Sequence, residues 1–308
     1  MTQISQMRLQ IALALLLSLT AANVARSQEL EPRAFANLPV GTSFALLGYV
    51  YASGNSLLDP ALSIEGLEAR LHTVAAAYVR SIDLFGHSGK VDVVLPFAGS
   101  DYEGTIAGRD STTARTGFGD PRLRLSVNFL GAPALSSEEF REYQQETIFG
   151  ASVQVVIPIG QYDPDRLLDL GSNRWIFRTQ VGASRKTGLW TWEAYGGAWF
   201  FTENPDFLGE LDLSQKPLLV GKLHAIRALP KGYWVALGAG YGVGGKVEVN
   251  GAPRESHISS FRFGLTVSVP LSRNHQLKFV GATTARFERG TDTDILSVFY
   301  QFRWGSGL

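Results

Sequence analysis

The sequence predicts an all-β protein, a transmembrane antiparallel up-and-down β-barrel of about twelve strands. Apolar residues recur at every second position through successive runs of about ten residues, and turn residues separate the runs. After the amino terminus, no segment is apolar for the roughly 20 residues that a helical span needs. A membrane crossing by this chain would therefore be made by strands.

The clearest alternation covers residues 260–271. One parity is apolar throughout, with Phe261, Phe263, Leu265, Val267, Val269 and Leu271. The other parity carries Arg262, Gly264, Thr266 and Ser268. Because successive side chains of a strand point to opposite faces, one face suits hydrocarbon and the other suits water. A soluble two-sheet sandwich could alternate in the same way, and the amino terminus helps to decide between these folds.

The amino terminus has the features of a secretory signal peptide. Residues 1–8 carry a positive charge, residues 11–22 are apolar, and small residues follow. Cleavage at Ala25 and Ser27 would start the mature chain near Gln28. We therefore expect a signal peptide at residues 1–27, a barrel at residues 28–308, and a location in the bacterial outer membrane.

The composition agrees with a single barrel that has a water-filled lumen. The formal net charge is zero at pH 7, so the chain has no overall bias toward nucleic acid. It contains no cysteine, which excludes a lipid-modified amino-terminal Cys. Many of its 33 glycines fall inside the strand patterns, where they let a wall bend or leave room at inward positions.

Parity and turn residues place the strands in order. We expect them at residues 43–53, 69–83, 88–102, 117–130, 147–160, 174–186, 189–202, 216–229, 232–245, 257–271, 275–288 and 294–305. This count is even, as in bacterial barrels.

The connections alternate between two classes. Tight turns are expected at residues 84–88, 186–188, 229–232 and 272–275, and longer polar loops at residues 103–116, 161–173, 203–215, 246–256 and 289–293. This alternation is typical of periplasmic turns and external loops, and it places both termini in the periplasm. The periplasmic connection 131–146 is longer, and its Ser136 and Glu139 predict a short surface helix.

The inward parity carries more cations than carboxylates. The ionisable residues expected to line the lumen are Lys90, Asp92, Arg122, Arg124, Arg178, Glu193, Lys222, Arg262, Lys278, Arg286 and Arg303. A basic constriction would favour anions. Alternatively, these charges pair with Asp92, Glu193 and loop carboxylates and fill a narrow barrel, since about twelve strands enclose little space.

Aromatic residues gather at the ends of the runs. Most should form interfacial girdles, as expected for Trp175, Phe177, Trp190, Trp192, Phe200, Phe201, Tyr233, Trp234, Tyr300, Phe302 and Trp304. Tyr195 and Trp199 have the opposite parity to their neighbours and should point inward. There they could contact an aromatic solute or simply fill the lumen.

Several motifs resemble one family of barrels. They are residues 29–34 (ELEPRA), 38–41 (LPVG), 91–96 (VDVVLP), 117–122 (GFGDPR), 131–135 (GAPAL), 158–164 (PIGQYDP) and 171–175 (GSNRW). Together they resemble the outer-membrane transporter family named for the MetA-pathway of phenol degradation. The resemblance implies an outer-membrane barrel that passes small, often aromatic, compounds, and it assigns no binding residues.

Other chemistry finds less support. The histidines lack metal-ligand spacing, so we expect neither a metal nor another cofactor. The main alternative is a barrel phospholipase, because His257 and Ser259 form a His-x-Ser pair at a strand start. No polar group that would orient the histidine is evident, so we expect a protein that is not an enzyme. A structural barrel with a plugged lumen is a further alternative.

The sequence therefore predicts an outer-membrane channel or transporter for small solutes that are aromatic or anionic. The expected partners are the lipid bilayer and lipopolysaccharide, the barrel-assembly machinery and a small-molecule solute, with no nucleic acid. The aromatic last strand, with Phe299, Tyr300, Phe302 and Trp304, is the expected assembly signal.

Overall fold

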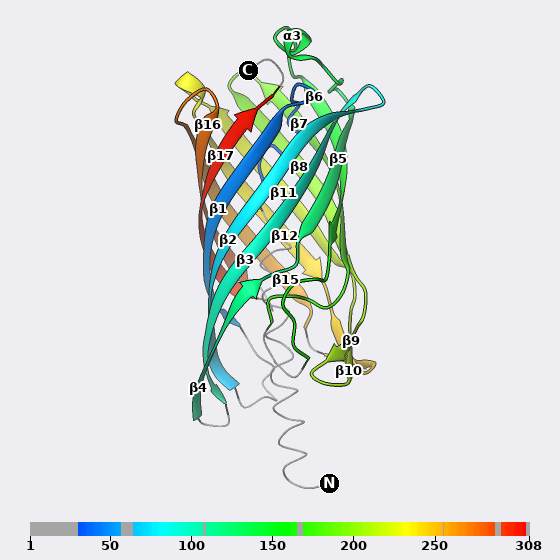
Figure 1. Ribbon diagram of the computed structural model, residues 1–308, viewed down its shortest axis with the longest axis vertical. Helices are drawn as coiled ribbons and strands as arrows, with labels where there is room; N and C mark the ends of the chain where they lie inside the picture. Colours follow the sequence, from blue (N-terminus) through cyan, green and yellow to red (C-terminus); the bar gives the residue numbers. More distant parts are fainter. Residues whose placement is uncertain are drawn as a thin grey trace.

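The computed structural model describes residues 30–56, 64–106, 109–164, 169–254, 256–286 and 291–305. In this part of the chain, the main sheet contains thirteen strands. Two of them, β4 and β5, lie end to end against β3, so the sheet closes between β2 and β3 as a barrel of twelve strands. Figure 1 shows the long, tilted strands around a single lumen. The predicted fold and strand number are confirmed.

The described barrel strands are β1 (Ser43–Ser56), β2 (Ile64–Leu84), β3 (His87–Ile106), β4 (Arg109–Phe118), β5 (Arg122–Leu130), β6 (Thr147–Val156), β7 (Ile176–Thr187), β8 (Trp190–Phe201), β11 (Leu218–Ala228), β12 (Trp234–Gly244), β15 (Ile258–Pro270), β16 (His275–Arg286) and β17 (Thr291–Trp304). The first and last strands pair antiparallel, with Ser43 opposite Trp304. Among the described residues, no helix is long and apolar enough to cross a membrane.

The barrel wall is apolar outside and polar inside. On β15, Phe263 is 50% exposed, whereas Arg262 and Ser268 are buried. Strand β11 has the same pattern of exposed apolar and buried polar residues, since Leu223 is 62% exposed beside the buried Lys222. A soluble sandwich would bury the apolar parity instead, so this arrangement identifies a wall that faces lipid.

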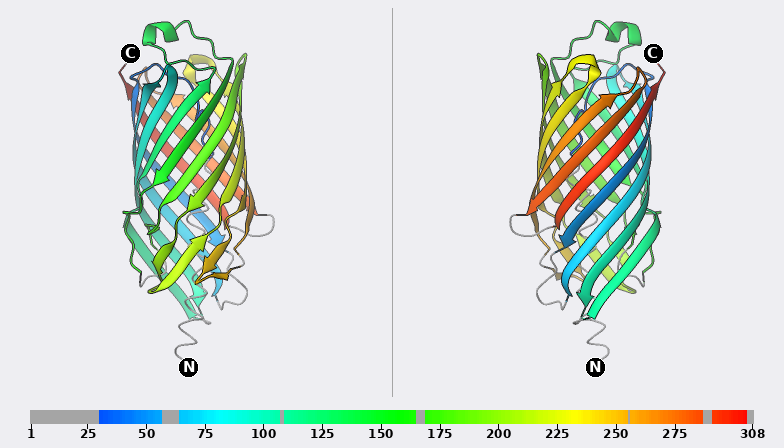
Figure 2. Two further views of the ribbon diagram at one scale, coloured as in Figure 1. Left: turned by 90° about the vertical axis from the view of Figure 1, so that its right-hand side faces the viewer. Right: turned by 90° about the vertical axis from the view of Figure 1, so that its left-hand side faces the viewer.

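The short turns and the ends of the first and last strands share one end of the barrel. Figure 2 shows the end of β17 at this end from both sides, together with the helical connection between β5 and β6. The helix in that connection, α3 (Ser137–Phe140), begins with a capping box between Ser136 and Glu139, as the sequence predicts. By the rule that periplasmic connections are short, this is the periplasmic end.

Two expected external loops are strands instead. Residues 203–215 and 246–256 form β9 (Asn204–Phe207), β10 (Leu211–Gln215), β13 (Val247–Val249) and β14 (Ala252–Pro253), which pair as a small second sheet. The reason is a short apolar alternation in both segments. Phe207, Leu213, Val247 and Val249 pack together in one buried cluster.

The prediction of an external loop at residues 103–116 is also wrong, because most of these residues belong to β3 and β4. Strands β3 and β4 continue as a paired hairpin to Ile106 and Arg109, and β2 extends beside β3 to Ile64 (Figure 1). Regular pairing stops at Pro121, which has no N–H to donate, and β5 resumes against β3 from Arg122. Pro121 therefore separates two strands where the sequence predicts one, at residues 117–130.

Candidate functional site: the lumen and its amino-terminal strap

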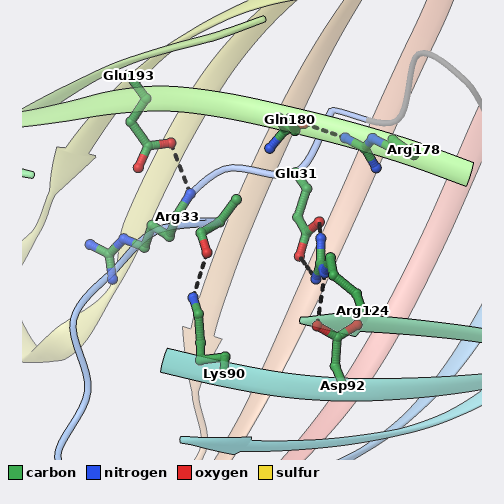
Figure 3. Close-up of polar contacts among 9 residues, drawn as sticks. Glu31, Arg33, Lys90, Asp92, Arg124, Arg178, Gln180 and Glu193 are labelled. Atoms are coloured by element: carbon green, nitrogen blue, oxygen red, sulfur yellow. Dashed lines mark hydrogen bonds and ion pairs between the residues drawn. The ribbon is translucent and has the colours of Figure 1, made fainter. Parts of the chain in front are cut away.

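The lumen contains a segment of the chain that does not belong to the wall. Residues 30–42, here called the strap, run inside the barrel and end at the start of β1. Figure 3 shows Glu31 and Arg33 of the strap surrounded by side chains of the wall strands. Phe35 is buried in a cluster with Ile148 and Tyr195, which belong to β6 and β8.

Inward glycines make room for the strap. A Cβ atom at Gly264 would lie 2.8 Å from Cδ1 of Leu30, and one at Gly240 would lie 3.2 Å from Cδ2 of Leu30. On the other side of the lumen, a Cβ at Gly150 would lie 2.5 Å from the Phe35 ring. These glycines in the strands therefore act as seats for strap side chains.

The most extensive polar contact joins the strap to β5 and β3. The Arg124 guanidinium donates to Glu31 through Nη1 and Nη2, at 2.6 and 2.9 Å from the two carboxylate oxygens. Its Nε donates to Oδ2 of Asp92 at 2.8 Å. Two parallel bonds of this kind make the strongest form of an arginine–carboxylate pair. Glu31 thus completes the coordination of a wall arginine.

A second set of contacts holds the next residues of the strap. The backbone N–H of Arg33 donates to Oε2 of Glu193 at 2.8 Å, and Nζ of Lys90 donates to the carbonyl oxygen of Ala34. The Arg33 guanidinium lies over the Trp234 ring, 4.7 Å from its centroid. Trp234 is therefore a buried lumen residue, and its expected place in the interfacial girdle is wrong.

The strap is also fixed at the periplasmic end. The N–H of Val40 donates to the carbonyl oxygen of Leu135 at 2.8 Å, and the Ser81 hydroxyl donates to the carbonyl oxygen of Pro39 at 2.5 Å. Asn37 donates through Nδ2 to the carbonyl oxygen of Pro133 at 3.3 Å. Two motifs noted in the sequence, residues 38–41 and 131–135, thus bind each other.

The cations around Glu31 keep it ionised. Burial disfavours its charged form, but the Arg124 guanidinium, with further attraction from Arg178 and Arg122, holds the pKa of Glu31 well below its usual range. At neutral pH Glu31 therefore presents a full negative charge to the wall.

The structure places the predicted lumen residues as follows. Inside the barrel and buried are Asp92, Arg178, Glu193, Tyr195, Trp199, Lys222 and Arg262. Half-buried on the wall strands are Lys90, Arg122, Arg124 and Lys278. Arg303 lies at the periplasmic rim, where Nη2 donates to the carbonyl oxygen of Arg273 at 2.9 Å. The side chain of Arg286 and the predicted signal peptide, residues 1–27, lie outside the described residues.

The lumen has features of both arrangements that the sequence left open, the basic constriction and the paired charges. Arg124 pairs with Asp92, as the pairing alternative expects, yet cations still outnumber the carboxylates that face them. The strap carboxylate Glu31 was missed, because the strap has no strand periodicity from which a direction could be read. His224 was missed too, although it shares the inward parity of Lys222 and its Nδ1 lies 3.8 Å from Oε2 of Glu193.

A row of inward side chains crosses four neighbouring strands beside Glu31. Arg124 of β5 is in register with Gln154 of β6, which is in register with Arg178 of β7, and Trp199 of β8 follows. The Arg178 guanidinium lies 5.2 Å from the centroid of the Trp199 ring. The row therefore combines hydrogen-bond donors and an aromatic face on one side of the lumen.

The pair that suggested a phospholipase has another arrangement. The Ser259 hydroxyl lies 3.0 Å from the hydroxyl of Tyr241, and Ser259 is buried whereas His257 is exposed. The serine is thus engaged by a tyrosine of the neighbouring strand, which gives no support to a nucleophile activated by His257.

Comparison with known proteins identifies the family. Residues 60–293 match the family model described as Putative MetA-pathway of phenol degradation. The chain belongs to this family. The match runs from just before β2 to the beginning of β17, and the strap and β1 lie before it. A search of curated protein sequences gives no match.

Two solved structures resemble this member of the phenol-degradation family. The COG4313 outer membrane channel from Pseudomonas putida F1 is 20% identical, with 90% of this chain and 100% of that chain covered and a TM-score of 0.74. The transport unit of the autotransporter AIDA-I from Escherichia coli is 7% identical, with 93% and 98% covered and a TM-score of 0.51. At these identities the likeness concerns the fold.

The sequence motifs that suggested the phenol-degradation family meet at the external end as well. Asp120 is buried, and its carboxylate accepts from the N–H of Gly160 at 2.8 Å and from the N–H and hydroxyl of Ser172 at 2.8 and 2.6 Å. Gly171 donates to the carbonyl oxygen of Gln161 at 2.8 Å. One aspartate between β4 and β5 therefore holds together the connection from β6 to β7.

Proposed function

We propose that this protein is a passive outer-membrane channel for small solutes, with a lumen narrowed by its own strap. One observation carries this proposal: a closed barrel with an apolar exterior holds a polar interior, in which the occupying segment is attached by side-chain contacts and glycine seats. A structural barrel would gain more stability from a packed apolar lumen, because buried charges add little net stability. The Pseudomonas putida protein of similar fold is an outer membrane channel, which agrees with the proposal.

The lumen would favour anions. Arg122, Arg178, Lys222 and Arg262 all face inward, and a narrow basic passage concentrates anions through its field. Glu31 of the strap cancels part of this charge, Arg33 of the strap adds a cation, and an excess of cations remains. The expected partners follow from the same proposal: a small-molecule solute in the lumen, lipid and lipopolysaccharide on the outer wall, and assembly machinery that reads the aromatic β17.

Planar-bilayer recording of the refolded protein, without residues 1–27, tests the proposal. Under a salt gradient we expect discrete current steps and a reversal potential that indicates anion preference. The Arg122→Glu variant should move the reversal potential toward cation preference. Unchanged selectivity would contradict the basic filter, and a folded barrel that never conducts would contradict the channel.

The location needs a separate test. We propose export through a signal peptide that is cleaved near Ser27, so that the mature chain starts just before the strap. Mass spectrometry of the amino-terminal peptide from outer-membrane fractions should give a start near Gln28. An uncleaved amino terminus in that fraction would contradict the proposed processing.

A further inference from the structure

Arg124 holds two carboxylates that differ in origin. Asp92 lies directly opposite Arg124 in the register between β3 and β5, so this partner is part of the wall. Glu31 is presented by the strap, outside the sheet, yet it takes the bidentate side of the guanidinium at 2.6 and 2.9 Å (Figure 3). This is the geometry by which an arginine binds a free carboxylate group. Glu31 therefore occupies a position that a carboxylate from another molecule could fill.

A further donor lies next to this position. Gln154 stands between Arg124 and Arg178 in the register of β5, β6 and β7, and its side chain is 3% exposed. Within the described residues, its Nε2 is buried without a hydrogen-bond partner. Such a donor costs free energy unless it is satisfied, and the tethered Glu31 carboxylate leaves it without an acceptor. A free carboxylate on Arg124 is not attached to the strap, so it can shift toward β6 and accept from this donor.

The surroundings supply both charge and an apolar contact. Arg178 and Arg122 attract the Glu31 carboxylate in addition to Arg124, so an anion at this position is favoured by three guanidinium groups. Beyond Arg178, the Trp199 ring lies in a buried apolar cluster with Leu218 and Val220. A ligand with a carboxylate at one end and an apolar ring at the other matches this order of side chains.

We propose that Arg124, with Gln154, is a binding site for small aromatic carboxylates, and that Glu31 of the strap is its built-in competitor. The ligand carboxylate takes the two Nη bonds that Glu31 makes, and the strap side chain leaves the position. The site deepens the proposed channel function and rests on it for its role in transport. No covalent step is involved.

Binding of 4-fluorobenzoate, followed by its fluorine NMR signal, tests the site in refolded protein in a non-ionic detergent. The uncharged 4-fluorobenzamide is the matched ligand, since it has the same ring without the carboxylate. Glu31→Gln removes the competing charge and should tighten 4-fluorobenzoate binding about tenfold, because a neutral amide competes less strongly for the Arg124 guanidinium than a carboxylate does. Its effect on 4-fluorobenzamide should be small.

Glu193→Gln is the control for a loosened strap. It weakens the anchor of the Arg33 N–H but leaves Glu31 in place, so it should change the binding of the two ligands equally. Arg124→Lys keeps the positive charge and loses the fork, and Arg124→Gln loses both. Each should lower 4-fluorobenzoate affinity at least tenfold in barrels whose fold is verified by circular dichroism.

The outcomes separate this site from the channel proposal. Equal effects of Glu31→Gln and Glu193→Gln, or 4-fluorobenzoate binding that survives both Arg124 variants, would overturn the site. Binding that depends on Arg124 in a barrel that never conducts would support the site and contradict the channel. Conduction together with binding that does not depend on Arg124 would support the channel and contradict the site.

Discussion

At the scale of single residues, a few charged side chains connect segments that are far apart in the sequence. Arg124 joins the strap to β3, and Asp120 joins the break before β5 to the connection between β6 and β7. Asp120 belongs to the motif at residues 117–122, and the resemblance continues from there to Asn128, so that it includes Arg124. The motif is therefore explained by two contacts at different depths, one at the external end and one in the lumen.

Replacing Asp120 should weaken the external end. Asp120→Ala leaves the N–H groups of Gly160 and Ser172 without their acceptor, which costs about 1–3 kcal/mol for a buried donor. We expect faster hydrogen–deuterium exchange in residues 157–164 and 169–175, measured by mass spectrometry. Glu203→Ala is the control, because Glu203 is exposed. Equal exchange in both variants would show that Asp120 does not hold this connection.

The strap anchor should depend on pH only in acid. Because the pKa of Glu31 is lowered in the folded protein, its stabilising effect is fully present above its unfolded value of about 4.3 and disappears as the pH falls through the folded value. The free energy of unfolding should therefore differ between the wild-type protein and Glu31→Gln by a constant amount from pH 7 to about pH 5. A difference that disappears between pH 7 and pH 5 would mean that Glu31 is not held by Arg124.

Parity alone predicts the direction of single wall residues such as Arg262 and Tyr195, because a strand has a period of two. Parity does not predict which residues these side chains contact inside the barrel. The strap carries no regular periodicity, so Glu31 looked like one more charge near the amino terminus. The pairing of Asp92 with Arg124 was considered in the sequence, whereas the third member of that group required the path of the strap.

At the scale of elements, the wall strands lie where the sequence predicts them, whereas the external segments differ from the prediction. Each wall strand is long enough for alternation to be recognised, but β9, β10 and β13 span only a few residues each. Their apolar residues become buried only when the two segments meet, since Phe207 and Leu213 pack on Val247 and Val249 from a segment more than 30 residues away. Such a small sheet depends on contacts that single-segment patterns do not contain.

The glycine seats give a prediction about the strap as an element. Gly264→Val would place atoms within 2.8 Å of Leu30, and overpacking of this kind costs about 1–3 kcal/mol. The chain has no native cysteine, so Pro32→Cys provides a single labelling site in the strap. Reaction of this cysteine with a water-soluble maleimide should become about tenfold faster in the Gly264→Val background.

Gly196→Val is the matched control for this labelling. Gly196 belongs to β8 and is exposed on the outer wall, and a Cβ atom there would meet no other atom within 4 Å. It should leave the labelling rate unchanged. If Gly264→Val also leaves the rate unchanged, the strap is not seated on the inward glycines.

At the scale of the whole molecule, the barrel combines a lipid-facing exterior with an interior that its own chain occupies. A depression of about 1120 Å³ lies on the outer wall, between the exposed Leu223, Leu237 and Leu296. The lumen, in contrast, is crossed by the strap and its contacts. Fold class and strand number could be predicted from the sequence, because lipid outside and water inside impose the alternation on every strand. The occupancy of the lumen could not, because it depends on the fit of the strap to inward glycines.

The central claim is that the lumen is a passage restricted by the strap. Single-channel recording of the wild-type protein beside a variant with Leu30→Ala and Phe35→Ala tests it most directly, since these substitutions empty both glycine-lined seats. With the fold of both proteins verified by circular dichroism, we expect larger and more frequent conductance steps in the variant than in the wild-type protein. Identical conductance in the two proteins, or silence in both, would contradict the claim.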